Sequence, residues 1–131
     1  MELIAELGSG PREVSRARRA LSRSLTGWGW TGDAVDVAVL LTSELVTNAI
    51  RHGAAPVRLS AGLLQLAVLR VEVLDSTGHR GHGHGPAVRA ATEEDEDGRG
   101  LQLVDVLADA WGWRPADAGG KRVWFELGAR S

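Results

Sequence analysis

Glu44 and Asn48 place a carboxylate and a carboxamide four residues apart in an otherwise apolar segment, with Arg51 and His52 one turn further on. Residues four apart in an α-helix lie one above the other, so these side chains project together. Mg²⁺ prefers oxygen ligands, which an asparagine carbonyl supplies, and a nearby carboxylate can orient or deprotonate a hydroxyl. The same pair could equally form the hydrated edge of a helix, and the spacing alone does not decide between the two interpretations.

Two further candidates stand at the ends of expected elements. Asp75 follows an alternating apolar strand, where a carboxylate can accept a hydrogen bond from an exocyclic amine such as that of adenine, or can simply end the strand. Gly98 and Gly100 flank Arg99 just before a short helical pattern, and glycines there let backbone N–H groups approach an anion. No third glycine follows at the required spacing, so the dinucleotide-binding fingerprint is not met.

The elements that must position these residues follow from apolar periodicity. Helical spacing predicts three helices, and alternation predicts a first strand, a central pair turning near Gly62 and a closing hairpin. The expected helices cover residues 11–25, 33–52 and a short segment beginning after Gly100, and the expected strands cover 2–7, 56–61, 66–75, 110–114 and 122–127. Strands adjacent in sequence with helices grouped outside them favour an α+β two-layer sandwich over a Rossmann arrangement.

Composition restricts the class of protein. The chain has 131 residues, a formal net charge of -2 and no cysteine, which predicts one domain and excludes a disulfide framework, a thiolate metal site and a cysteine nucleophile. The absence of a basic excess argues against direct nucleic-acid binding. Charged residues interrupt the longest apolar stretch, 57–74, so a membrane span is not expected, and the default expectation is a cytoplasmic protein.

One charged pattern remains outside these candidates. Four arginines, Arg12, Arg16, Arg19 and Arg23, recur on one face of the helix expected over 11–25. Such a stripe is commonly a solvated helix surface, and a partner-binding surface is the alternative interpretation.

The order of the segments resembles the histidine-kinase/gyrase-type ATPase domain, or Bergerat fold. The resemblance is to its short single-domain bacterial branch, which contains anti-sigma-factor serine kinases and ATP-binding regulators of actinobacterial type. It covers nearly the whole chain and implies an α+β sandwich of a mixed, mostly antiparallel sheet with helices on one face. The segments that carry the resemblance are ELVTNAIRHG (Glu44–Gly53), the strand ending at Asp75, the glycine-rich loop, GRGLQLVDVLADAWG (Gly98–Gly112) and GKRVWFEL (Gly120–Leu127).

The resemblance also implies roles for individual residues. Asn48 matches the asparagine that ligates Mg²⁺ between the ATP phosphates, Glu44 the glutamate that acts as general base or orients the attacking group, and Asp75 the aspartate that binds the adenine amine. Residues 76–97 correspond to the lid over ATP. Further expected nucleotide-binding residues are His52, Gly78, Gly98, Arg99, Gly100 and Leu101.

The chain departs from the family pattern at three places. The family's Asp-x-Gly spacing is one residue longer here, since Gly78 follows Asp75 by three positions. Arg122 follows Lys121 where the family usually has a threonine that helps to bind adenine. Three histidines within 79–84 could bind a metal ion, although a polar lid without fixed ligands is the alternative.

The leading functional hypothesis is an ATP- and Mg²⁺-dependent serine/threonine kinase acting on a partner protein, namely a sigma factor or an anti-anti-sigma-like substrate. A homodimer is compatible with it. The alternative is a binding module that sequesters a transcription regulator without phosphoryl transfer. A third hypothesis, ATP hydrolysis driving a clamp as in gyrase, requires a transducer domain for which the sequence leaves no residues.

Overall fold

The computed structural model describes residues 1–65, 67–76, 96–117 and 119–129, of which 96–100 are described by their backbone alone. Within this part of the chain the elements follow the expected order of one strand, two helices, two strands, one helix and two strands. Their bounds are β1 (Glu2–Leu7), α1 (Pro11–Gly27), α2 (Gly32–His52), β2 (Val57–Leu64), β3 (Val68–Leu74), α3 (Glu96–Leu107), β4 (Ala110–Pro115) and β5 (Lys121–Gly128).

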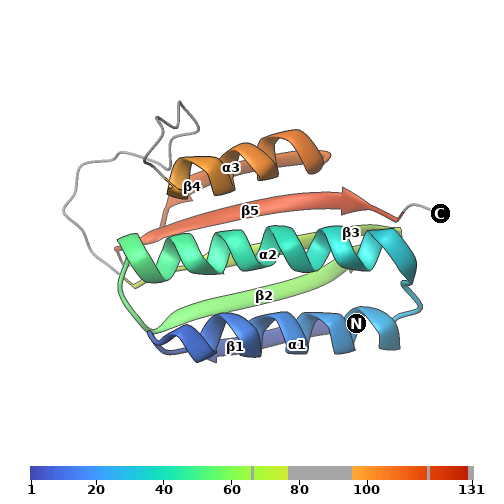
Figure 1. Ribbon diagram of the computed structural model, residues 1–131, viewed down its shortest axis with the longest axis horizontal. Helices are drawn as coiled ribbons and strands as arrows, with labels where there is room; N and C mark the ends of the chain where they lie inside the picture. The colour runs from blue at the N-terminus through green and yellow to red at the C-terminus, as the bar shows by residue number, and fades with distance from the viewer. Residues whose placement is uncertain (66, 77–95, 118, 130–131) are drawn as a thin grey trace.

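The five strands form one sheet in the order β1-β2-β3-β5-β4, and each of the four pairings is antiparallel. The helices cover one face of this sheet, and α2 lies between α1 and α3 (Figure 1). The predicted α+β two-layer sandwich is thereby confirmed. None of the described helices is both long enough and apolar enough to cross a membrane.

Side-chain alternation along the strands builds the core between the two layers. Leu69, Val71 and Val73 of β3 are buried against the helices, as are Phe125 and Leu127 of β5. The central helix α2 supplies the other half of the core because its apolar residues recur at helical spacing. The α2 residues buried there are Ala34, Ala38, Leu41, Thr42, Leu45, Val46 and Ala49.

The other face of the sheet has no covering layer among the described elements and is closed by paired charges instead. Arg70 donates hydrogen bonds to Glu72 (3.0 Å) and Glu126 (2.7 Å), and its guanidinium lies 4.2 Å from the centre of the Trp124 ring. Arg122 pairs with the other oxygen of Glu72 at 3.2 Å. Desolvation lowers the pKa of Arg70, but the bonds to Glu126 and Glu72 outweigh it and leave the pKa raised.

Two expected boundaries were wrong. Gly62 does not turn the chain, because it pairs with Glu2 on one side and Arg70 on the other, and the turn comes at Gln65, whose φ is 55°. Extending β2 to Leu64 adds two further ladder pairs to β3, which outweigh the local turn preference of glycine. Helix α3 begins at Glu96, so the Gly98–Gly100 segment lies inside its first turns instead of before it.

The charge network on the uncovered face gives a stability prediction. Replacing Arg70 with alanine leaves the half-buried Glu72 and Glu126 without their shared cation, and we expect the free energy of unfolding in urea to fall by about 1–3 kcal/mol. Arg58 offers the matched control, because it pairs with Glu6 at 3.3 Å while both side chains are more than half exposed. Arg58→Ala should cost less than about 1 kcal/mol. Equal losses in the two variants would contradict a structural role for the network.

Candidate functional site

Four element ends meet at one end of the molecule. Since α2 and α3 run in opposite directions, the C-terminal end of α2 lies beside the N-terminal end of α3 (Figure 1). Since β3 and β5 pair antiparallel, the last residues of β3 lie beside the first residues of β5 at this same end. The fold therefore gathers the segments that the sequence singled out separately.

Asp75 is the most confined polar residue at this end. Its side chain is only 2% exposed and lies on the helix-covered side of the sheet, in step with the buried residues of β3. Lys121 donates to both carboxylate oxygens, its backbone N–H to Oδ1 and its Nζ to Oδ2, each at 3.2 Å. Asp75 in turn donates its own N–H to the Lys121 carbonyl oxygen at 3.1 Å. The two residues thus continue the β3–β5 ladder by one pair.

Two glycines pack directly against Asp75. A Cβ placed on Gly53, just after α2, would lie 2.5 Å from the Asp75 carboxyl carbon. A Cβ on Gly120, where φ is +79°, would lie 2.8 Å from Oδ1 and collide with the Asp75 carbonyl. Both contacts are far below van der Waals distance, so only glycine fits at either position. Ser76 completes this arrangement by donating its N–H to the carbonyl of Ala54 at 3.0 Å.

Glu44 and Asn48 lie on the side of α2 that faces α3. With Val37 and Leu41 they follow the 4-3-4 spacing of a single helix stripe. Val37 lines a small cavity of about 120 Å³ together with Leu107 of α3, which fixes the direction of that stripe. Glu44 and Asn48 are both half-buried. The helix thus projects the carboxylate and the carboxamide together, as their spacing predicted, and the side of α2 that carries them faces α3.

The remaining predicted residues take different positions. His52 is exposed at the last turn of α2. Gly98, Arg99 and Gly100 fall in the first turns of α3. Because the helix begins at Glu96, only the N–H groups of its first residues, up to Gly98, have no intrahelical acceptor. Leu101 is 3% exposed and belongs to the core. Gly78 lies outside the described residues, and so do the histidines of 79–84.

Arg122 does not enter the surroundings of Asp75. Successive strand residues point to opposite faces, so Arg122 projects onto the uncovered face, where it pairs with Glu72, while Lys121 projects toward the helices. The substitution for the family's threonine therefore leaves the contacts of Asp75 as described. The sequence did not reveal Lys121 as a partner of Asp75, because that pairing depends on the β3–β5 register, which no local pattern contains.

A buried carboxylate, a carboxylate–carboxamide pair and a helix N-terminus lie at one end of this two-layer α+β sandwich. The family model described as histidine kinase-like ATPase domain matches residues 7–127. The chain belongs to this family of ATP-binding domains. A comparison with curated proteins gave no match.

Solved structures confirm the fold. One match is the crystal structure of the RsbU and RsbW domains of Rv1364c from Mycobacterium tuberculosis, with a TM-score of 0.72 and 20% sequence identity. The match covers 97% of the present chain and 32% of that one, so the chain spans about a third of the length of this neighbour. At this identity the likeness concerns the fold.

The contact between Gly53 and Asp75 gives a prediction about ligand binding. Gly53→Ala must displace the carboxylate, and we expect the affinity for a fluorescent ATP analogue to fall at least tenfold, or about 1.4 kcal/mol. Gly27→Ala is the matched control, because a Cβ there meets nothing within 4 Å. Its affinity should equal that of the wild type. Circular dichroism would check that both variants fold, and undiminished binding by a folded Gly53→Ala would contradict the placement of the site.

Proposed function

We propose that this domain binds ATP with Mg²⁺ and transfers the γ-phosphoryl group to a serine or threonine of a partner protein. The observation that carries the proposal is the gathering of the Asp75 site, the Glu44–Asn48 stripe and the start of α3 at one end of the molecule. The likeness to a structure that includes an RsbW domain also supports this proposal. By the resemblance of its motifs, we propose a sigma factor or an anti-anti-sigma-like protein as the partner, and the cytoplasm as the compartment.

The surroundings of Asp75 suit the base of ATP. Oδ2 is an acceptor, and Lys121 Nζ, 3.2 Å away, is a donor. The edge of adenine offers the complementary pair, an N6 amine that donates and an N1 nitrogen that accepts. The glycine contacts of Gly53 and Gly120 hold the carboxylate in one position, so its hydrogen-bond direction is set before the nucleotide binds.

The side of α2 that faces α3 suits the phosphates. The Asn48 side-chain oxygen would be one ligand of Mg²⁺, whose remaining positions phosphate oxygens and water would fill. When bound, this ion would neutralise charge on the phosphates. The backbone N–H groups at the start of α3, residues 96–98, have no intrahelical acceptor and add donors at the positive end of the helix dipole.

Glu44 would act on the attacking hydroxyl. The partner's serine or threonine oxygen forms a bond to the γ-phosphorus, while the bond from that phosphorus to the β–γ bridging oxygen breaks and ADP leaves. The hydroxyl proton passes to the Glu44 carboxylate. Because Glu44 precedes Asn48 by one helical turn, base and metal ligand share one rigid element, which fixes the distance between the two functions.

The role of Asn48 predicts how Mg²⁺ affects binding. Wild-type affinity for ATP should be at least tenfold higher with Mg²⁺ than with a chelator, and Asn48→Ala should remove most of that difference while keeping the metal-free affinity. Thr47→Ala, a half-buried neighbour on α2, is the control and should keep the Mg²⁺ effect. Titration calorimetry with and without the ion measures both. A full Mg²⁺ effect in Asn48→Ala would contradict the assignment of Asn48 as a ligand of the ion.

The role of Glu44 predicts a loss of transfer without a loss of binding. Glu44→Gln should lower phosphate incorporation into the partner by roughly 10²–10⁴-fold, with ATP affinity within about threefold of the wild type. Asp36→Asn removes an exposed carboxylate from the same helix and should leave transfer unchanged. Labelled ATP and the purified partner provide the measurement. A partner that forms a stable complex and gains no phosphate would favour the alternative function, sequestration without transfer.

A further inference from the structure

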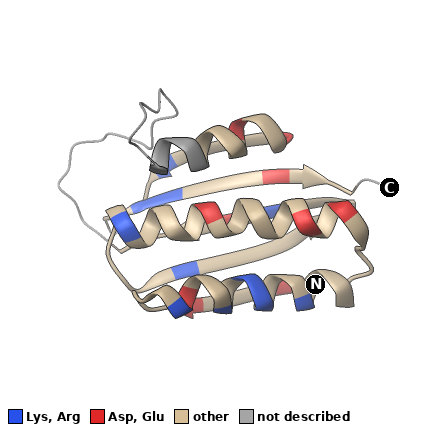
Figure 2. Cartoon of the chain, viewed as in Figure 1, with Lys and Arg blue, Asp and Glu red and all other residues tan. Residues whose placement is uncertain are grey.

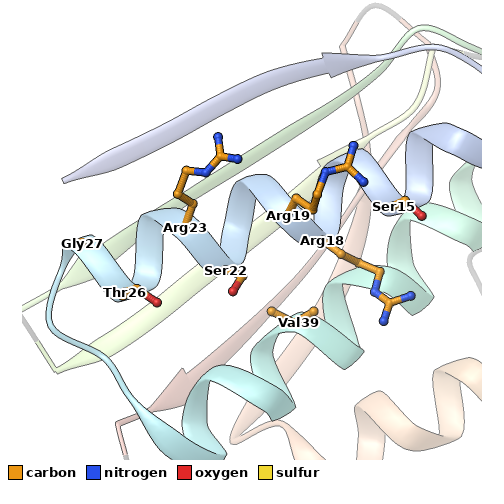
Figure 3. A pocket seen from close by; sticks show the side chains of 8 residues that line it. All are labelled: Ser15, Arg18, Arg19, Ser22, Arg23, Thr26, Gly27 and Val39. Carbon is orange, nitrogen blue, oxygen red and sulfur yellow. The ribbon is translucent and has the colours of Figure 1, made fainter.

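The outer surface of α1 is hollowed. An open depression of about 870 Å³ runs along the helix from Ser15 to Gly27, which corresponds to roughly 18 Å at 1.5 Å per residue. We call it the α1 arginine surface. The residues that line it are Ser15, Arg18, Arg19, Ser22, Arg23, Thr26, Gly27 and Val39 (Figure 3).

The side chains are arranged in three lines. The small hydroxyl residues Ser15, Ser22 and Thr26 follow the 7-4 spacing of one helix stripe and form the middle of the hollow. Arg18 reaches toward α2 on one flank, and Arg19 and Arg23 lie side by side on the other (Figure 3). A segment lying along the middle line would therefore have cations on both sides.

The charges of these arginines are not compensated by the described part of the chain. Arg18, Arg19 and Arg23 make no ion pair there, whereas Arg16 of the same helix binds Glu13 at 2.7 Å. Helix α1 contains five arginines and one glutamate in a chain whose net charge is -2 (Figure 2). Three long cations held around one hollow repel each other, so an anionic occupant would gain from all three.

We infer that the α1 arginine surface docks an acidic helix of a partner protein. The length of the hollow matches about three turns of helix, the hydroxyl line lets the partner's backbone approach, and acidic residues on both edges would pair with the arginines. Val39 gives the α2 wall an apolar contact. Nucleic acid fits less well, because the chain has a net charge of -2 and lacks the basic excess typical of nucleic-acid-binding domains.

The surface is separate from the candidate nucleotide site. Val39 lies on the flank of α2 toward α1, whereas Glu44 and Asn48 lie on the flank toward α3. The inference depends on the proposed function in one respect, which is that the binding partner is a protein. Changes in the α1 arginine surface should therefore alter docking and leave ATP binding as it is.

The test uses the whole chain and a labelled acidic peptide of about 14 residues, helical, with glutamates along both edges and alanine and leucine between them. Fluorescence anisotropy at about 50 mM salt should show saturable binding, and a peptide with every glutamate replaced by glutamine should not bind. Arg18→Glu and Arg23→Glu should each weaken binding at least fivefold. Arg114→Glu makes the same charge change at an exposed site on β4 and should stay within twofold of the wild type.

The outcomes separate the possibilities. Equal losses in Arg23→Glu and Arg114→Glu, or no saturable peptide binding, would overturn the inference. A single-stranded oligonucleotide of the same length that binds more tightly than the peptide, and loses binding in the same variants, would assign the surface to nucleic acid instead. ATP affinity measured in each variant keeps the two proposals apart, since failure of docking with intact ATP binding counts against the α1 arginine surface alone.

Discussion

A carboxylate removed from water is costly unless it is paired, and the Asp75 side chain is almost wholly buried. Its partner is the chain's only lysine, Lys121, which supplies both a charge and a backbone donor. This pair exists only if β3 and β5 keep their register to the last residue. It also requires glycine at positions 53 and 120, since any side chain there would occupy the same space. One buried charge thus fixes a strand register, a helix end and a turn.

Helix α2 connects this constraint to the rest of the molecule. Its C-terminal end is held against Asp75 through Gly53, its inner face forms the core, and its two flanks face α1 and α3. A packed helix of 21 residues does not bend independently at each site. Its two flanks therefore separate the α1 arginine surface from the candidate phosphate site.

Periodicity predicted most of the fold because the core is built on it. The spacing of the apolar residues directly predicts the buried stripe of α2 and the alternation of β3 and β5. The layer arrangement follows from the order of the helices and strands along the chain. The prediction of a turn near Gly62 was wrong because glycine's local preference for turns competes with ladder pairs that only the folded sheet supplies. The same limit applies to the site. Asp75 was recognisable, but its pairing with Lys121 depends on a register that no local pattern contains.

Arginine has two different roles in this chain, one in the stability of the fold and one in the proposed docking, and the two groups of arginines lie on different surfaces. On the uncovered sheet face Arg70 and Arg122 alternate with glutamates across neighbouring strands, so their charges are satisfied within the fold and contribute to its stability. On α1 the spacing brings arginines around a hollow with no carboxylate among its lining residues. A folded chain gains nothing for its own stability from cations that repel one another. We therefore assign to a ligand the three α1 arginines that make no ion pair with the described part of the chain. Composition alone, with its near balance of charge, could not distinguish them from the paired arginines.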